Sequence, residues 1–194
     1  MRWKKFTIAV SLLILGVSGH LDAQNPYNFM LLPEMVGFSP SVTRRPYYPA
    51  GAVDINVFPL TWMYGNTRRM HSRNALILNL GIREGEAIAI DNFGVSSFIP
   101  IYIKPRELQS EVASGVYIAP GVEMIFSREP FAVNYDVKLL LESGYSFPVE
   151  NMTISAGLQG GLLYHSDNSD PTLMMKTIYL HFGVNVTVGF WHLF

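Results

Sequence analysis

The C-terminal segment constrains the fold of this chain more than any other part. In TIYLHFGVNVTVGFWHLF, residues 177–194, a hydrophobic side chain stands at every even position from Ile178 to Phe190, and glycine, asparagine, threonine and histidine stand among the odd ones. A period of two is typical of a β-strand, whose side chains alternate between two faces. The segment carries no charge and could almost span a bilayer as a helix, but its alternation would spread polar groups around a helix. We therefore predict a strand.

The same alternation returns along most of the chain. It is clear in residues 74–83, 114–126, 131–147 and 152–165, and weaker in residues 28–38, 53–64 and 95–104. With the C-terminal segment this predicts eight strands in one all-β domain. We expect long connections over residues 39–51, 84–94 and 166–176, and tight turns over residues 127–130 and 148–151. Since proline lacks a ladder donor, Pro33, Pro59, Pro100 and Pro120 require either bulges or strand limits that differ from these.

Residues 1–23 are predicted to be a cleavable signal peptide. The opening MRWKK is positively charged, and an apolar stretch follows over residues 6–19. The small residue Ala23 precedes Gln24, which indicates cleavage between them. An uncleaved anchor is the alternative, but the apolar stretch is short for a span of about 20 residues. The exported domain is then residues 24–194.

The polar face of the strands indicates which side meets water. Only 15% of the residues are charged and 49% are hydrophobic, whereas about 25% are charged in an average soluble domain. Residues 151–166 and 177–194 contain no Asp, Glu, Lys or Arg. Such a face is a poor exterior for a soluble barrel but a good lining for a narrow lumen. We therefore predict an antiparallel up-and-down transmembrane β-barrel, with its hydrophobic face toward lipid and its polar face inward.

The C-terminal strand resembles the β-signal of Gram-negative outer-membrane barrels, which ends in an aromatic residue preceded by alternating hydrophobes. The matching positions are Val184, Val186, Val188, Gly189, Phe190 and Phe194. The resemblance implies location in the outer membrane, contact with outer-membrane lipids, and insertion by the barrel-assembly machinery. The alternative is a sheet-closing strand of a secreted protein, because a buried sheet strand and a lipid-facing strand have similar sequence patterns over one segment.

Charged residues on the inward face predict a paired network in the lumen. Its expected members are Asp54, Arg83, Lys104, Glu123, Asp136, Lys138 and Glu142, with Glu34 and Arg73 as two further candidates. Charges of both signs must pair in a confined interior, because an unpaired one costs several kcal/mol. Eight strands enclose a space that side chains just fill. The network is therefore expected to stiffen a filled barrel, and the alternative is a narrow polar path for small solutes.

Catalysis is not expected. Some outer-membrane barrels modify lipid A, and the stretch MHSRNA places His71 beside Ser72. Neighbouring residues on a strand point to opposite faces, so these two could not act as nucleophile and base there. The spacing also differs from the His-x-Ser-Asn stretch of the lipid A deacylases.

No cofactor or metal is expected either. His165 and His181 both face inward, but at different depths. The stretch SDNSDP could hold calcium loosely, but its composition favours a solvated loop. A net charge of −1 gives no reason to expect nucleic acid.

The β-signal also sets an expected orientation, with the last strand ending in the periplasm. Residues 148–151 then form a periplasmic turn, and the long connections lie outside, where they could bind a surface ligand. Aromatic residues near the strand ends suit the two membrane interfaces. These are Trp62, Tyr64, Tyr135, Tyr145, Tyr164 and Trp191.

The predicted facing can be tested on adjacent residues. Val186→Lys should prevent assembly, because a lysine facing lipid near mid-membrane costs about 2 to 4 kcal/mol. Thr187→Lys should be milder, since that side chain faces the lumen. Heat-modifiable migration on gels measures the folded fraction. Equal tolerance at both positions would contradict the assignment.

Overall fold

The structure of the protein is a computed structural model. It describes residues 33–44, 53–56, 60–65, 67–81, 89–106, 112–128, 133–167 and 175–191. The expected signal peptide lies outside these ranges and stays a prediction. No helix within them has the length and hydropathy needed to cross a bilayer.

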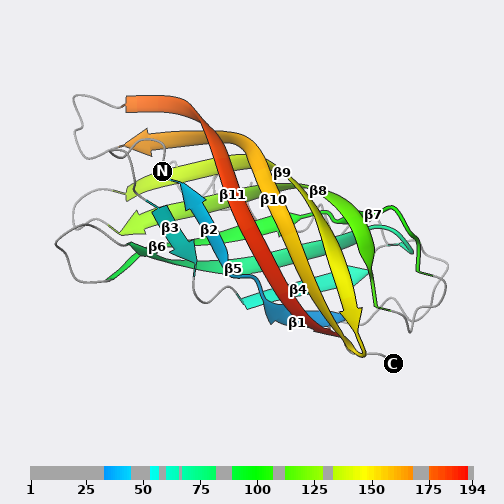
Figure 1. The fold of residues 1–194 in the computed structure, drawn as a ribbon. Coiled ribbons are helices and arrows are strands. Elements are labelled where there is room, and N and C mark those ends of the chain that lie inside the picture. The colour runs from blue at the N-terminus through cyan, green and yellow to red at the C-terminus, as the bar shows by residue number, and fades with distance from the viewer. Residues whose placement is uncertain are drawn as a thin grey trace, which may run out of the picture.

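One antiparallel sheet holds all the described strands (Figure 1). They are β1 (Met35–Phe38), β2 (Ser41–Arg44), β3 (Val53–Asn56), β4 (Leu60–Gly65), β5 (His71–Gly81), β6 (Ala89–Phe98), β7 (Ile101–Tyr102), β8 (Gly115–Arg128), β9 (Val133–Val149), β10 (Met152–Asp167) and β11 (Met175–Trp191). Three passes across the sheet are each broken in two, β1 with β2, β3 with β4, and β6 with β7, so the segments make eight passes. The prediction of an eight-stranded all-β barrel is confirmed.

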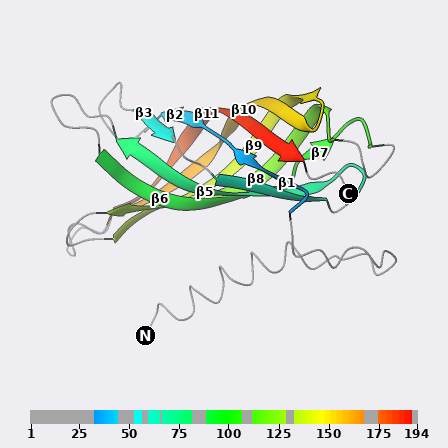
Figure 2. The same cartoon turned by 90° about the horizontal axis from the view of Figure 1, so that it is seen from below.

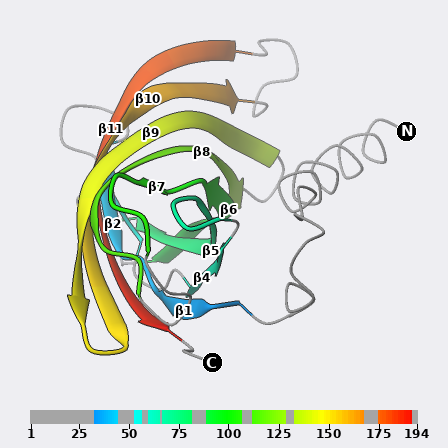
Figure 3. The same ribbon diagram turned by 90° about the vertical axis from the view of Figure 1, so that its right-hand side faces the viewer.

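The first pass pairs with the last and closes the sheet. β1 runs beside β11 from Met35 opposite Trp191 to Phe38 opposite Val188. β2 continues along β11 as far as Thr43 opposite Gly183. Figure 2 shows the curved sheet from below, and Figure 3 shows the strands ringed around an interior. Among the described strands, the backbone ladder therefore has no long free edge.

The two ends of the barrel differ in their connections. The connections after β4, β7 and β9 lie at the end where β11 finishes, here called the turn end. β2, β5, β8 and β10 finish at the opposite end, here called the loop end. The β9–β10 turn is only two residues long, and its Glu150 has a φ of 54° in the left-handed region. This turn sets the register of the β9–β10 hairpin.

The two faces of the sheet have opposite chemistry. On β11, Phe182 on the outer face is 64% exposed, whereas its neighbour His181 on the inner face is 1% exposed. The same alternation runs along β9 and β10, where Leu139 and Leu158 are exposed and Gln159 is buried. Hydrophobic side chains therefore cover the outside, and polar side chains fill the inside, as the alternation predicts.

Two expected loops prove to contain strand. Ser41–Arg44, inside the expected connection 39–51, is β2, and Ala89–Gly94, inside the expected connection 84–94, belongs to β6. β2 is held by β11, which is distant in sequence, and this part of β6 is held by β5, the preceding strand of the same hairpin. Proline, glycine and acidic residues nearby resemble turn signals, but the ladder overrides them.

Pro100 and Pro120 both lie beside the break between β6 and β7, so the strand limits differ from the expected ones. Pro100 lies in the gap between β6 and β7, and its carbonyl accepts the His71 N–H at 3.0 Å. Pro120 lies within β8 and accepts the Ile99 N–H at 2.9 Å. The ring nitrogen of Pro120 therefore faces that same gap, where no strand needs its donor. Pro33 precedes β1, and Pro59 is outside the described residues.

The closing seam depends on two glycines that face each other. Gly37 of β1 pairs with Gly189 of β11. A Cβ atom on Gly37 would overlap the Val188 carbonyl oxygen and lie 2.7 Å from the Gly189 Cα. Because the obstacle is backbone, it cannot rotate away. A side chain here would push the first and last passes apart.

Gly37→Ala should therefore lower the free energy of unfolding by about 1–3 kcal/mol, the usual cost of overpacking. Gly160→Ala is the matched control, because a Cβ there meets nothing within 4 Å. Urea unfolding of the folded barrel in detergent, followed by gel mobility, measures both. Equal midpoints for the two variants would show that the seam has room for a methyl group.

Candidate functional site in the barrel interior

A single carboxylate organises the middle of the interior. Glu142 of β9 is 0% exposed. Its two oxygens accept hydrogen bonds from four side chains on four other strands: Arg73 Nη2 at 2.8 Å, Tyr117 Oη at 2.7 Å, Gln159 Nε2 at 2.8 Å and Asn185 Nδ2 at 3.1 Å. A buried charge is tolerated only when it is paired and hydrogen-bonded, and Glu142 meets both conditions. We call these five residues the Glu142 cluster.

The strand register brings the cluster together. Gln159 lies directly opposite Glu142 on the neighbouring strand β10. Tyr117 lies opposite Gly144, which in turn lies opposite Gly157. A Cβ on either glycine would lie within 3 Å of the Tyr117 hydroxyl, so the ring occupies the space that the two glycines leave. The glycines thus allow Tyr117 to lie across β9 and reach Glu142.

Arg73 connects opposite walls of the barrel. It projects from β5, which is not a neighbour of β9 in the sheet, and Nη2 lies 2.8 Å from both oxygens of Glu142. Its guanidinium group also lies over the Phe98 ring, 5.1 Å from the centroid. Cation–π contact and a paired carboxylate together compensate the loss of water around this buried cation.

Two more pairs of polar side chains lie toward the loop end. Lys138 Nζ contacts Glu123 Oε1, and these residues are directly opposite on β9 and β8. His165 Nδ1 lies 2.6 Å from Asp136 Oδ1, across the β9–β10 pair. Each of these two pairs joins neighbouring strands, so paired side chains lie at successive depths along the inner wall.

The turn end is closed by a different set of contacts. Arg106, in the connection after β7, pairs with Glu34 Oε2 at 3.1 Å and lies 5.5 Å from the Trp191 ring centroid. Trp191 Nε1 donates to Thr153 Oγ1 at 3.1 Å. Trp191 was expected at the membrane interface, but it is buried inside. Its odd position in β11 places it on the inward face, which the interface expectation overlooked.

The structure places the predicted charges unevenly. Glu123, Asp136, Lys138 and Glu142 lie buried on the inward face. Lys104 does not join them, because the strand ends at Tyr102 and Lys104 lies exposed in the following bend. Asp54 lies in β3 opposite Gly81, but its side chain is not among those that the structure describes. Arg83 lies outside the described residues altogether.

Sequence reasoning missed several partners of these charges. Arg73 was only a further candidate because the strand was expected to start at residue 74, whereas β5 starts at His71. With that start, Arg73 is an even number of residues from Asn79, whose side chain faces inward. This spacing could have placed Arg73 on the inward face. Arg106 lies in an irregular connection, where no periodicity exists to place a side chain.

His71 lies among aromatic side chains near the turn end. His71 packs edge-on against the rings of Tyr102 and Trp191, with centroids 5.5 and 5.9 Å away. Within the described residues, no group of three or more His, Cys, Asp or Glu side chains could hold a metal ion. The SDNSDP stretch extends beyond those residues.

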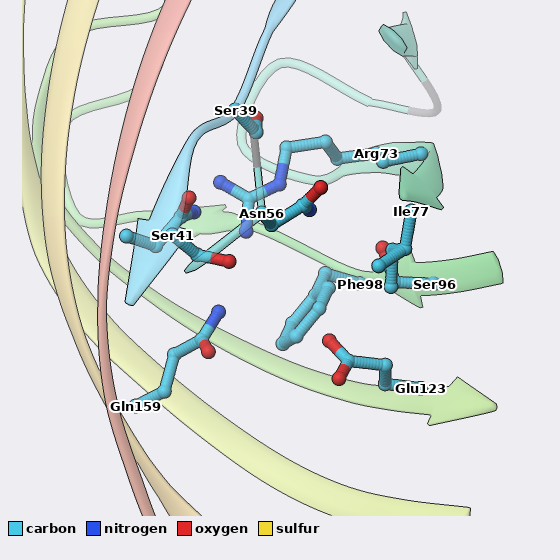
Figure 4. A pocket seen from close by; sticks show the side chains of 11 residues that line it. Ser39, Ser41, Asn56, Arg73, Ile77, Ser96, Phe98, Glu123 and Gln159 are labelled. Carbon is cyan, nitrogen blue, oxygen red and sulfur yellow. The ribbon is translucent and has the colours of Figure 1, made fainter. Parts of the chain in front are cut away.

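A small polar cavity lies beside the Glu142 cluster (Figure 4). It is lined by Ser39, Ser41, Asn56, Arg73, Ala75, Ile77, Ser96, Phe98, Glu123, Gln159 and Asn185. Its volume is about 20 Å³, and one water molecule needs roughly 10–15 Å³ on this measure. The cavity can therefore hold about one water molecule.

The positions of the expected assembly signal mostly face outward. Val184, Val186 and Phe190 are exposed on the outer face of β11, and Val188 shares their parity. Gly189 faces inward at the closing seam. Phe194 lies outside the described residues.

Comparison with known proteins gives little beyond this geometry. No protein-family model matches the chain, and no curated protein matches its sequence. Among solved structures, that of Ail, the attachment invasion locus protein of Yersinia pestis, is similar at 13% identity and a TM-score of 0.40, over 80% of this chain and 94% of that chain. At this level the likeness carries no functional argument.

The Glu142 cluster predicts a large stability effect. Glu142→Ala should lower the free energy of unfolding by about 3–5 kcal/mol, because it leaves the Arg73 guanidinium group buried without its charge partner. Removing both charges in Arg73→Met/Glu142→Leu should recover part of that loss. Urea unfolding in detergent micelles measures each variant.

Lys104→Gln is the matched control, since Lys104 is charged but exposed. It should change the unfolding free energy by no more than about 0.5 kcal/mol. A Glu142→Ala barrel as stable as the Lys104→Gln barrel would show that the cluster does not hold the walls together.

Proposed function

We propose that this protein is an integral β-barrel of a Gram-negative outer membrane, with a structural or surface-interaction role. The observation that carries the proposal is the inverted sheet. Among the described side chains, the outer face of β9, β10 and β11 is apolar except at Ser143, and the charged side chains described for these strands lie inside. Hydrocarbon is the solvent that favours this arrangement.

Exposing the same apolar surface to water would be energetically unfavourable. The exposed hydrophobes on the three longest strands include Leu139, Leu141, Leu158, Leu162, Ile178, Leu180 and Phe182. Soluble monomers rarely expose contiguous apolar patches beyond a few hundred Å². A closed ladder also suits a bilayer core, because lipid cannot pair a free strand edge. Both features support residence in a membrane.

The filled interior supports a role that does not depend on transport. The ion pair of Arg73 with Glu142 connects facing walls of the barrel, and the contacts of Lys138 with Glu123 and of His165 with Asp136 join neighbouring strands. Such a barrel is a rigid anchor for the connections at its loop end, which would face outward if β11 ends in the periplasm. A surface ligand would then bind those connections. We assign a catalytic role to no residue.

A narrow pore is the second candidate, and the polar cavity favours it. Arg73 and Glu123 line this cavity, and both are already paired, Arg73 with Glu142 and Glu123 with Lys138. Conduction would require those pairs to open. Planar-bilayer recordings separate the candidates, because a filled barrel should give no steady openings.

The membrane assignment has a direct test. The protein should fractionate with outer membranes, require detergent for extraction, and migrate differently on gels before and after boiling. The closed ladder resists unheated detergent, which is the reason for the mobility change. A monodisperse preparation without detergent would overturn the proposal.

A further inference from the structure

The apolar outer surface ends abruptly at one place on the turn end. Ile103 is 64% exposed, and its N–H donates to the Val116 carbonyl at 3.0 Å. Val116 is exposed as well and pairs with the exposed Tyr145 on β9. These three residues form an apolar row across neighbouring strands. The next residue after Ile103 is the exposed Lys104.

Two more cations lie beside Lys104. Arg68 and Arg69 are exposed in the β4–β5 turn. The Arg69 carbonyl accepts the Tyr102 N–H at 2.9 Å, and the Arg68 carbonyl accepts the Arg106 N–H at 3.0 Å. The backbone of residues 67–70 is thus attached to the backbone of residues 101–106. We call residues 67–70 and 101–104 the basic rim.

The backbone of the basic rim is well held. Thr67 Oγ1 accepts the N–H groups of Arg69 and Met70, at 3.2 and 2.9 Å. Met70 also forms a bridge with Ile101. The cations therefore project from an ordered turn, and ordering on ligand binding would cost little.

The charge of the basic rim is uncompensated among the described residues. None of the described ion pairs uses Arg68, Arg69 or Lys104. The nearby carboxylate of Glu34 already pairs with Arg106. Exposed apolar side chains, Met70 and Ile101 among them, accompany the cations. This combination of an apolar surface bordered by cations matches the boundary between acyl chains and phosphate groups.

We propose that the basic rim binds the phosphate groups of anionic glycerophospholipids in the periplasmic leaflet. The inference rests on the proposed function, which places the apolar row in acyl chains and the turn end in the periplasm. Guanidinium and ammonium groups then meet phosphates at the depth where the apolar surface stops. Arginine binds a phosphate through paired N–H donors, and lysine acts as a point charge.

The chain carries its own reporter for this site. Trp62 lies in the same β4–β5 hairpin as Arg68 and Arg69, and it faces outward between the buried Thr61 and Met63. Trp191 is buried inside the barrel. Bromine on lipid chains quenches tryptophan fluorescence on contact, so Trp62 senses lipid at the outer surface.

The experiment compares two brominated lipids at the same mole fraction in phosphatidylcholine vesicles that contain the folded protein. Brominated phosphatidylglycerol should show an apparent affinity at least about fivefold above that of brominated phosphatidylcholine, the factor that one cation near an anionic surface supplies. High salt should reduce this ratio toward one, since the charges are exposed. Equal quenching by the two lipids at low salt would overturn the inference.

Variants assign the preference to the basic rim. Arg68→Gln/Arg69→Gln/Lys104→Gln should bring the ratio close to one, whereas the charge-retaining Arg68→Lys/Arg69→Lys/Lys104→Arg should keep most of it. Glu150→Gln, which changes one exposed charge in a different turn of the same end, should leave it unchanged. A preference that survives in the glutamine variant would place the lipid elsewhere and overturn the inference.

Failure of this inference is distinguishable from failure of the proposed function. Quenching of Trp62 by neither brominated lipid would show that the outer surface does not contact acyl chains, which contradicts the membrane assignment itself. Equal quenching by both would leave the barrel in the bilayer and remove only the anionic preference. The salt dependence of the unmodified protein keeps the test decisive if the glutamine variant does not fold.

Discussion

Closure of the sheet between the first and last passes is the constraint on which the rest of this structure depends. Once β1 and β2 pair with β11, each of the eight passes has two neighbours and each side chain in the sheet has only two directions, inward or outward. Alternation then separates the chain into a hydrophobic exterior and a polar interior. The seam itself tolerates no side chain at Gly37, because the two backbones approach too closely there. A small residue at one position therefore supports the separation of faces throughout the barrel.

The enclosed polar face creates its own requirement. A carboxylate such as Glu142, removed from water, must find donors within the lumen, and it finds them on β5, β8, β10 and β11. The same contacts that satisfy the charge also connect opposite walls. Space is limited enough that Tyr117 reaches the cluster only by lying over Gly144 and Gly157. Burial, pairing and rigidity are thus consequences of one geometry, and the small cavity beside the cluster is the space left after the side chains have packed.

Sequence-based prediction was accurate where the strands are long and continuous. β9, β10 and β11 follow the predicted segments closely, because uninterrupted alternation of hydrophobic and polar residues has no competing interpretation. It was inaccurate at β2 and in the first half of β6, where the ladder holds turn-like residues through pairing with β11 and with β5, respectively. The prediction of inward-facing charges was likewise accurate on clear strands and inaccurate beyond their limits. Parity along a clear strand placed Glu123, Asp136, Lys138 and Glu142 inside, whereas Lys104 lay beyond the true end of its strand, and Arg73 lay before the expected start of its own.

By itself, the sequence determined the all-β class, the number of passes and which side chains of the long strands face together, because each of these follows from a local period of two. Only the tertiary structure decided which charges meet. Arg73 and Glu142 are far apart in sequence and lie on strands that are not neighbours, so no local pattern can join them. It also decided that Trp191 and Arg106 close one end, and that Arg68, Arg69 and Lys104 share one rim. These contacts depend on curvature and register, which arise only when the sheet closes.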